Sequence, residues 1–528
     1  MAKFNIYQVL PRLWGKGKFS DWTQAEFDYL TRMGISHVWY TGVLRHARGK
    51  AFVKGEPGSP YAITDYYDVN PYLADKAAAR MKEFEALIAR THRAGLKVIL
   101  DFVPNHVARD YHSFCAPKGV RDLGADDDPT QHWSKENDFY YYPGTPLQLP
   151  EEVTQAALQA GLPAYTENPA KASGNCFTPQ PGKNDWYETV RLNYCPFHTG
   201  TWDKMYEIVR FWAAKGIDGF RCDMVELVPP PFFQWMIAKI KEEFPAVIFI
   251  AEVYDREGYR QYLEEIGFDL LYHKTGFYDS LRAITQCGLR RAGIHPGGRI
   301  PEGADVSPRL LSEDWQRVDG LQDRLLNFLE NHDEQRLASD FYAGNGARGL
   351  AALSFALLFN RAPFMLYFGQ EIGERGMDSE GFSGRDGRTS IFDFWTIDSI
   401  QTLENIIRRG AYKNGSVNEL VSEGLSIQQA QLLLRYRQVL SLSLEEPFRS
   451  GKTFDLCYCQ GGNAEGLFPF LRGDGKVVSL VVCNFTAQKR RERIMLPPEA
   501  ADYLNRKDLP ASFEVTVPAF DFSVASLE

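Results

Sequence analysis

Short apolar runs alternate with amphipathic stretches along the N-terminal part of the chain. KFNIYQVLPRLW at residues 3–14 and ISHVWYTGV at 35–43 have the length and residue types that strands use. Between them, Thr23 and Glu26 stand at capping-box spacing, which predicts the start of a helix. The pattern therefore predicts a strand, a helix and a second strand in that order.

The same alternation continues through the chain. Residues 76–95 carry apolar side chains at helical spacing and end at Gly95, and the strand-like run KVILDFVPNH at 97–106 follows directly. Later apolar runs at 269–277 and 361–369 predict further strands. Alternating strands and helices are typical of a parallel sheet closed by helices. We expect an α/β fold in which these strands form a barrel, with 361–369 as the eighth strand.

One interval is too long for a single strand–helix unit. A unit takes roughly 25–40 residues in a barrel of about 250, whereas Asp223 lies 122 positions after Asp101. The excess lies between His106 and about Thr201, where Pro, Gly, Tyr and Asn are frequent and no long helical period is found. We therefore predict a subdomain at 107–201, inserted on the rim of the barrel after the third strand.

The pattern changes to short alternating runs near the C-terminus. GLFPFL at 466–471 and VVSLVVCNF at 477–485 flank a Gly473-Asp474-Gly475 turn, which predicts a β-hairpin within a small antiparallel β-domain. The predicted domains are the barrel, the rim subdomain and this β-domain, at 1–106 with 202–448, at 107–201 and at 449–528.

Composition and charge exclude some classes of protein. The chain has 528 residues, of which 44% are hydrophobic and 13% aromatic, enough to bury a large core in two or three domains. A net charge of −9 argues against nucleic acid as a partner and favours a neutral or weakly charged ligand. Because no apolar leader or membrane-spanning run is found, we expect a cytoplasmic protein, although a chain trimmed of its signal peptide would look the same. The sequence leaves the oligomeric state open.

Three apolar runs end in carboxylates. They are GFRCDMVE at 219–226, FIAEVYD at 249–255 and FLENHDEQR at 328–336. The carboxyl ends of all strands in a parallel barrel meet at one rim, so these acidic side chains can converge on one point. A pair of carboxyl groups that meets in this way is what cleavage of a glycosidic bond requires.

Arg221 and Asp223 are two positions apart in an extended run and therefore point the same way. A buried arginine and a buried carboxylate are costly unless they are paired. Asp101, in the run at 97–106, offers a further partner. We expect Asp101, Arg221 and Asp223 to form one charged cluster in which Asp101 anchors Arg221.

The motifs together resemble those of the α-amylase superfamily of retaining glycoside hydrolases (glycoside hydrolase family 13). Its four motif regions appear in order, as DFVPNH, GFRCDMVE, FIAEVYD and ENHD at 101–106, 219–226, 249–255 and 330–333. SPYAITDYYDVNP at 59–71 and LYFGQEIG at 366–373 resemble two further family segments. The resemblance covers nearly the whole chain. It implies a (β/α)8 TIM barrel with a rim subdomain after strand 3 and a C-terminal antiparallel β-sandwich.

The resemblance implies Asp223 as the nucleophile, Glu252 as the general acid/base and Asp333 as a third carboxylate that holds sugar hydroxyls. Retaining cleavage needs such a pair: one ionised carboxylate attacks the anomeric carbon, and one protonated carboxyl, about 5–5.5 Å away, releases the leaving oxygen. We expect Arg221, which we count among the substrate-binding residues, to keep Asp223 ionised. Burial and nearby negative charge should raise the proton affinity of Glu252.

By the same resemblance, further side chains would contact the sugar. His106 and His332 would hydrogen-bond its hydroxyls, and Tyr61 would stack on its ring. Arg336 and the segment GRDGRTSIFDFW at 384–395 would line neighbouring positions.

The resemblance offers Asn105 as a calcium ligand. Glu226 and Leu227, however, replace the Lys-His pair found in many endo-acting amylases, so part of the usual calcium site is missing. A structural calcium ion is therefore an option and not a requirement. No redox cofactor or nucleotide is expected.

The leading hypothesis is a retaining hydrolase of the α-amylase type that cuts α-1,4-linked glucose in starch, glycogen or maltooligosaccharides. An α-glucosidase, or a transglycosylase or isomerase of the trehalose synthase type, would use the same site with another acceptor or another mode of attack. A non-catalytic glucan-binding protein on the same fold is the third alternative. The sequence leaves open α-1,4 against α-1,6 linkage, endo against exo action, and hydrolysis against transfer.

Overall fold

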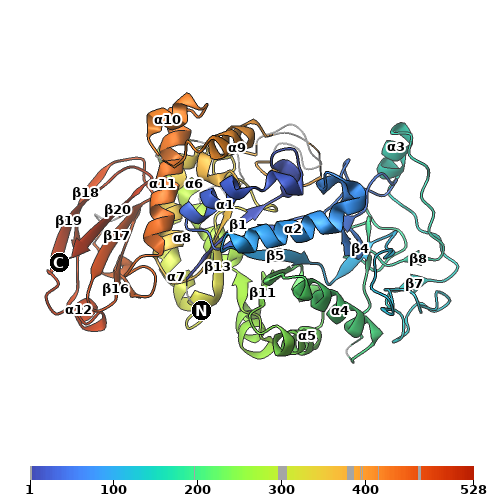
Figure 1. Cartoon of the computed structure of the whole chain (residues 1–528). Helices are drawn as coiled ribbons and strands as arrows, with labels where there is room; N and C mark the ends of the chain where they lie inside the picture. Colours follow the sequence, from blue (N-terminus) through green and yellow to red (C-terminus); the bar gives the residue numbers. More distant parts are fainter. Residues whose placement is uncertain are drawn as a thin grey trace.

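Eight parallel strands close into a barrel at the centre of the computed structural model, which describes residues 3–195, 197–294, 306–376, 386–392, 394, 397–413, 415–461 and 465–527 (Figure 1). In chain order the barrel strands are β1 (Asn5–Val9), β2 (His37–Tyr40), β5 (Lys97–Phe102), β10 (Gly219–Cys222), β11 (Ile248–Ala251), β12 (Leu270–Tyr272), β13 (Leu325–Phe328) and β14 (Phe364–Tyr367). Since β14 pairs in parallel with β1, the sheet has no free edge. The predicted barrel and its eighth strand are confirmed.

Helices cover the outside of the barrel. Those that follow barrel strands are α1 (Gln24–Arg32), α2 (Arg80–Arg93), α4 (Gly200–Ala214), α5 (Pro230–Glu243), α6 (Asp279–Arg291), α7 (Arg309–Arg317), α8 (Leu350–Leu358), α9 (Asp398–Arg409), α10 (Val417–Ser422) and α11 (Ile427–Ser443). A π-helical turn, Gln261–Ile266, follows β11. The predicted helix start is confirmed, because Thr23 caps α1 and Glu26 accepts the Thr23 N–H at 2.8 Å.

The rim subdomain is inserted between β5, the third barrel strand, and α4. It contains β6 (His106–Ala108), β7 (Tyr141–Tyr142), α3 (Glu151–Gln159), β8 (Ala170–Lys171) and β9 (Thr189–Arg191). The hairpin of β3 (Leu44–His46) and β4 (Ile63–Val69) packs against it through β6. The sequence did not predict α3, because only Ala157 of this nine-residue helix is buried and its apolar face is therefore narrow.

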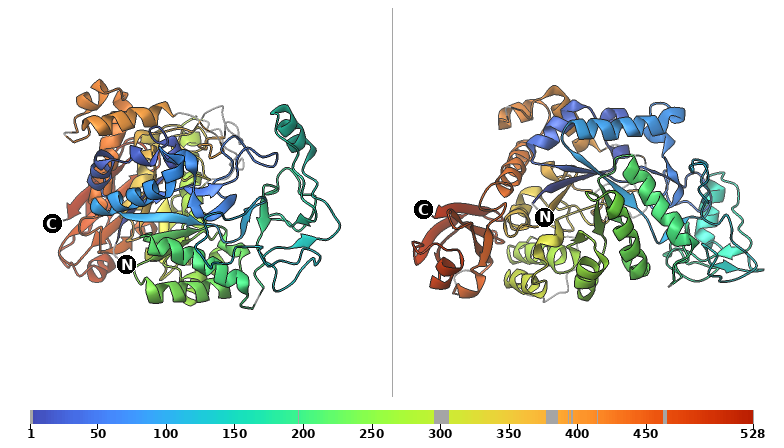
Figure 2. Two further views of the ribbon diagram at one scale, coloured as in Figure 1. Left: turned by 45° about the vertical axis from the view of Figure 1, so that its right-hand side comes forward. Right: turned by 60° about the horizontal axis from the view of Figure 1, so that its bottom comes forward.

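The C-terminal part of the chain forms two antiparallel sheets. One has the strand order β15 (Lys452–Asp455), β16 (Leu467–Gly473), β17 (Val478–Asn484) and β20 (Phe522–Leu527), and the other pairs β18 (Arg490–Met495) with β19 (Ser512–Val517). The short helix α12 (Pro498–Tyr503) follows β18. The predicted hairpin is β16–β17. In every view these sheets and the rim subdomain lie on opposite sides of the barrel (Figures 1 and 2).

Helix α8 forms much of the junction between the barrel and the C-terminal sheets. All nine of its residues, LAALSFALL, are buried. A helix that is apolar all round must be covered on every side, and α8 packs against β13 of the barrel on one side and against β17 of the C-terminal sheet on another. No helix in the described part of the chain combines the length and the apolar character needed to cross a bilayer.

A fully buried arginine ties the C-terminal sheet to this junction. Arg472 of β16 donates to the carbonyl oxygen of Leu358, the last residue of α8, at 2.7 Å. It also donates to the carbonyl oxygens of Pro447, Phe448 and Gly451 at 3.3, 3.1 and 2.7 Å. One side chain therefore satisfies four backbone acceptors, three of them in the connection from α11 to β15.

We predict that Arg472→Met lowers the free energy of unfolding by roughly 3 kcal/mol, because buried carbonyl groups lose their donors. Arg493→Met is the matched control. The Arg493 side chain on β18 is 67% exposed and pairs with Glu514, so its loss should change stability by less than about 0.5 kcal/mol. Urea unfolding curves measure both variants, and equal midpoints would contradict the role of Arg472.

Candidate active site

The carboxyl ends of the barrel strands bring three acidic side chains to one rim. Asp223 directly follows β10, Glu252 directly follows β11, and Asp333 lies in the loop after β13. Asp223 and Glu252 are 7% and 3% exposed, whereas the Asp333 side chain is 41% exposed. Two carboxyl groups are therefore enclosed, and the third faces solvent, on the side that is called the opening below.

The Arg221 guanidinium joins these three groups. It is fully buried, and its Nη1 donates to Asp223 Oδ1 at 2.5 Å. Its Nη2 forms an ion pair with Glu252 Oε2 at 2.8 Å and lies 4.0 Å from Asp333 Oδ2. Since one planar group contacts both enclosed carboxylates, Asp223 and Glu252 are close neighbours.

Aromatic rings fix the position of that guanidinium. Its central carbon lies 5.6, 5.3 and 5.4 Å from the ring centres of Trp39, Tyr61 and Tyr272. Arg221 Nε donates to Tyr272 Oη at 3.2 Å. The rings exclude water from Arg221 and add cation–π attraction, so this positive charge is held in one orientation.

Burial and charge give the three carboxyl groups different proton affinities. Burial, together with the negative charges of Asp223 and Asp333, raises the pKa of Glu252 to about 7, although Arg221 opposes the shift. Burial also raises the pKa of Asp223, against the pull of Arg221. Burial would raise the pKa of Asp333 too, but His332 and Arg221 outweigh it and lower that pKa to about 2. Glu252 is thus suited to carry a proton near neutral pH while Asp333 stays ionised.

Asp101 does not anchor Arg221 as the alternation pattern predicted. The two residues are register partners on β5 and β10. Within the described part of the chain, however, no ion pair of 4.0 Å or less joins them, and Asp101 Oδ2 accepts the Gly42 N–H at 3.3 Å. Register placed Asp101 beside Arg221 correctly, but the guanidinium extends along the barrel to Glu252 on the next strand.

The predicted sugar-binding side chains lie around the same rim. Tyr61 and His332 stack with ring centres 5.3 Å apart, and Tyr61 Oη lies 2.5 Å from His332 Nε2. His332 Nε2 is also 3.0 Å from Asp333 Oδ2. His106 is buried against Trp186, with 5.2 Å between ring centres, and burial lowers its pKa to about 3. The structure thus places Tyr61 and His332 directly beside the carboxylates.

Arg336 lies in the interior and not in the opening. It is fully buried, forms an ion pair with Glu330 at 2.8 Å and donates to Thr389 Oγ1 at 2.7 Å. This placement disfavours a direct sugar contact and indicates that Arg336 holds the segment around Thr389 on the barrel. Of the predicted rim segment, 384, 385, 393 and 395 lie outside the described residues; Arg388, which is described, is close enough to help lower the pKa of Asp333.

Two groups that contact Glu252 were missed by the sequence reasoning. The Tyr254 hydroxyl donates to Glu252 Oε1 at 2.5 Å, and the Met224 N–H donates to Oε2 at 2.9 Å. Met224 has φ +45°, an uncommon backbone conformation for a residue other than glycine. The signal for Tyr254 was available, since it stands two positions after Glu252, as Asp223 does after Arg221. No sequence signal marks the backbone of Met224.

Asn105, the predicted calcium ligand, is buried and already bonded. Its Nδ2 donates to the Gly174 carbonyl oxygen at 2.8 Å and lies 3.1 Å from His106 Nδ1. Calcium takes six to eight oxygen ligands, usually with several carboxylates. Neither contact supplies a carboxylate, so these observations do not favour a calcium site, and calcium binding stays a prediction.

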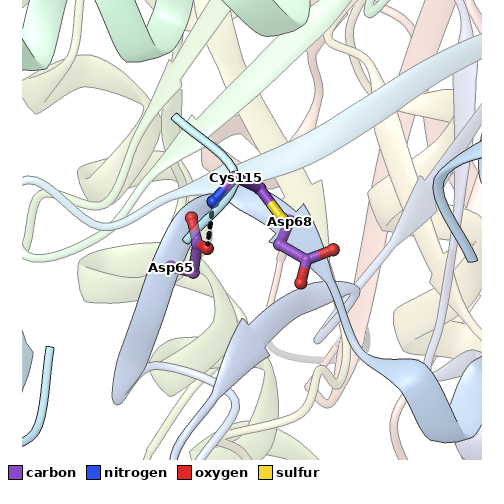
Figure 3. A group of neighbouring side chains, drawn as sticks. All are labelled: Asp65, Asp68 and Cys115. Carbon is purple, nitrogen blue, oxygen red and sulfur yellow. Dashed lines mark hydrogen bonds between the residues drawn. The ribbon is translucent and has the colours of Figure 1, made fainter. Parts of the chain in front are cut away.

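A second group of possible ligands combines two residues of β4 with a cysteine of the rim subdomain. Asp65, Asp68 and Cys115 are the one set of three His, Cys, Asp or Glu residues, among those the structure describes, whose ligand atoms lie within 4.8 Å of one another (Figure 3). Asp65 accepts the Cys115 N–H at 3.1 Å. Asp68 forms ion pairs with Arg80 at 2.7 Å and with Arg45 at 3.0 Å. A cation would have to displace two guanidinium groups, so the set is structural.

Comparison with known proteins agrees with this geometry. Residues 23–265 match the family model described as the catalytic domain of alpha amylase. This part of the chain belongs to the α-amylase superfamily. The resemblance recognised in the motifs is thereby confirmed, and so is the fold class that it implied.

Relatives in this superfamily differ in the reactions that their names describe. The alpha-1,4-glucan:maltose-1-phosphate maltosyltransferase of Mycolicibacterium smegmatis is 27% identical over 296 residues, 52% of this chain and 34% of its own. Alpha-amylase 3 of Dictyoglomus thermophilum is 23% identical over 366 residues, 66% of this chain and 59% of its own. The chain thus spans about a third of the first relative's length and less than two thirds of the second's.

Solved structures share the whole fold. The alpha-amylase of Geobacillus thermoleovorans, crystallised as a complex with acarbose, superimposes with a TM-score of 0.59 over 99% of this chain and 98% of its own. Its sequence is 19% identical to this one. At that identity the likeness shows the fold alone, so the chemistry must be argued from the residues of this chain.

The raised pKa of Glu252 has a consequence for stability. The folded chain keeps this proton up to about pH 7, whereas an unfolded glutamate, with a pKa of 4.5, has already lost it. Folding stability should therefore fall as pH rises from about 4.5 to about 7. We predict that Glu252→Gln removes this loss, so that its stability relative to the wild type grows by on the order of 1–3 kcal/mol across that window.

Unfolding curves recorded between pH 4.5 and 8 measure this effect. Glu83→Gln on α2 is the control. Glu83 accepts the Asp75 and Lys76 N–H groups and does not belong to the carboxylate cluster around Arg221. If the difference in free energy of unfolding between the wild type and Glu252→Gln stays constant from pH 4.5 to 8, the raised pKa of Glu252 is contradicted.

Proposed function

We propose that the protein is a retaining α-glucan hydrolase of the α-amylase type, which cleaves α-1,4-linked glucose in starch, glycogen or maltooligosaccharides. The observation that carries the proposal is the pairing of one buried guanidinium with two adjacent carboxyl groups, one of which has a pKa near neutrality. Membership of the α-amylase superfamily supports it.

The first half-reaction would use Asp223 and Glu252 in different roles. Asp223, paired with Arg221, attacks the anomeric carbon and forms a new C–O bond as the glycosidic C–O bond breaks. Glu252 gives its proton to the departing oxygen, so that the leaving sugar departs as an alcohol. Arg221 then faces a carboxylate at Glu252 in place of one at Asp223, so the enclosed pair keeps one negative charge throughout.

The second half-reaction would reverse these roles. Glu252, now ionised, takes a proton from water, and the water oxygen attacks the anomeric carbon and releases Asp223. The configuration at this carbon is inverted twice and therefore retained. Asp333, whose side chain is 41% exposed, would bind hydroxyl groups of the glucose unit, and the partly exposed Tyr61 would stack on its ring; His332, buried between them, would hold both in place. The chemistry needs no redox cofactor or nucleotide, and we keep a cytoplasmic location as part of the proposal.

Transfer to a sugar is the second candidate reaction. A sugar hydroxyl that enters in place of water would give a transglycosylase, and the similarity to a maltosyltransferase favours this alternative. An α-glucosidase or an isomerase would use the same groups. A glucan-binding protein without catalysis is disfavoured, because it would not need Asp223 and Glu252 enclosed against one guanidinium.

We predict that Glu252→Gln lowers turnover of maltooligosaccharides by at least about a thousandfold while leaving folding intact, because the leaving oxygen loses its acid. Turnover of α-glucosyl fluoride by Glu252→Gln should fall far less, since fluoride leaves without strong proton assistance. Asp223→Asn should turn over neither substrate, and Glu83→Gln should turn over both at the wild-type rate. Initial rates on the two substrates measure this split. Near-normal hydrolysis of maltooligosaccharides by Glu252→Gln would remove the acid/base assignment.

The products formed from maltoheptaose distinguish the candidate reactions. The proposal predicts shorter maltooligosaccharides whose new reducing ends first appear as the α-anomer. Glucose as the sole early product would indicate an α-glucosidase, and chains longer than seven units would indicate transfer. Chromatography of early time points, with NMR of the anomers, makes the measurement, and an initial β-anomer would contradict the retaining mechanism.

A further inference from the structure

The two oxygens of Glu252 have different partners. Oε2 accepts the Met224 N–H at 2.9 Å and lies 2.8 Å from Arg221 Nη2. Oε1 is bonded to the Tyr254 hydroxyl at 2.5 Å. An oxygen that accepts a backbone N–H and faces a guanidinium charge cannot also carry a proton without repulsion. A hydroxyl, in contrast, can either donate or accept. The proton of neutral Glu252 therefore belongs on Oε1, the oxygen beside Tyr254.

We propose that Tyr254 is a positioning residue for general acid catalysis, whose hydroxyl holds the proton-bearing oxygen of Glu252 in both of its protonation states. The proposal rests on the function proposed above. When Glu252 is neutral, its Oε1–H donates to Tyr254 Oη. When Glu252 is ionised, the Tyr254 hydroxyl turns and donates to Oε1, as it does in the structure.

This exchange fits the proton's path during cleavage. One O–H group donates to one acceptor, so an incoming glycosidic oxygen takes the place of Tyr254 Oη as the partner of Oε1–H. The proton then moves from Oε1 to the glycosidic oxygen as the C–O bond breaks. The Tyr254 hydroxyl stabilises the carboxylate left behind. In the second half-reaction, water returns a proton to Oε1 and the hydroxyl accepts again.

A separate contact fixes the backbone of Tyr254. The carboxylate of Glu226, in the turn after Asp223, accepts the Tyr254 N–H and the Asp255 N–H, each at 3.0 Å. The Lys274 ammonium lies 5.8 Å from the Tyr254 ring centre. These two hydrogen bonds form a clamp by which Glu226 holds the backbone of the segment that carries Tyr254.

The direction of the effect follows from the charges that face Glu252. Asp223 and Asp333 favour its neutral form, whereas Arg221 and the Tyr254 hydroxyl favour its ionised form. Removing the hydroxyl takes away one donor to the carboxylate, so the pKa of Glu252 must rise.

Tyr254→Phe tests the proposal, because it removes the hydroxyl and keeps the ring. We expect the alkaline limb of the kcat/KM profile on maltooligosaccharides to move to higher pH by about 1 unit, the size expected for one hydrogen bond to a charged group. We also expect kcat at the optimum to fall roughly tenfold. The melting temperature should stay within about 2 °C of the wild type.

Two further variants separate this effect from general damage. Tyr111→Phe removes a hydroxyl that donates to another carboxylate, Asp122, at 2.9 Å, and should leave the profile unchanged. Glu226→Ala removes the clamp without touching Glu252 and should move the limb in the same direction as Tyr254→Phe.

A direct titration keeps the proposal independent of activity. Infrared difference spectra of the substrate-free protein report the carboxylate of Glu252, which is assigned by its absence in Glu252→Gln. The midpoint should rise in Tyr254→Phe and not in Tyr111→Phe. An unmoved midpoint in Tyr254→Phe would overturn the proposal even in an active enzyme. If the wild type turns over no glucan while the midpoint still rises in Tyr254→Phe, the proposed function is rejected and the role of the Tyr254 contact stands.

Discussion

The structure at the barrel rim depends on one buried positive charge. Carboxylates that follow neighbouring strands at the same end of a barrel repel one another and lose hydration. Burying such charges costs free energy unless a positive charge pairs with them. Arg221 supplies that charge, with Asp223 at 2.5 Å and Glu252 at 2.8 Å. Because Arg221 lowers the pKa of both enclosed carboxyl groups against the effect of burial, its charge favours the ionised form that a nucleophile needs.

The barrel makes this arrangement possible in a simple way. Side chains two positions apart on a strand lie on the same face of the sheet, so Arg221 of β10 and Asp223, which follows the strand, point to the same side. Parallel pairing then brings the end of β11, and with it Glu252, alongside. The remaining parts of the chain complete the scaffold: helix α8 and Arg472 join the barrel to the C-terminal sheets, and β9 of the rim subdomain pairs with β6, which begins at His106.

Much of the fold could be predicted because the relevant signals are local. The capping box at Thr23, the apolar run at 361–369 and the turn at Gly473 each act within a few residues. The pairing of Arg221 with Asp223 also follows from strand alternation. The pairing of Arg221 with Glu252, and not with Asp101, could not be predicted, because the long arginine side chain can reach acidic groups on both neighbouring strands and the sequence does not say which it contacts. For the same reason, Arg336 turned inward to Glu330.

The central claim is that Asp223, held by Arg221, attacks the anomeric carbon and carries the sugar covalently. A 5-fluoro-α-glucosyl fluoride tests it most directly, since its good leaving group speeds the first step and its ring fluorine slows the second. Mass spectrometry of the intact protein and of its peptides should find one glycosyl group, bound to Asp223. The label should be absent from Asp223→Asn. A sugar bound to another residue, or release of fluoride by a wild type that never carries the label, would contradict the account.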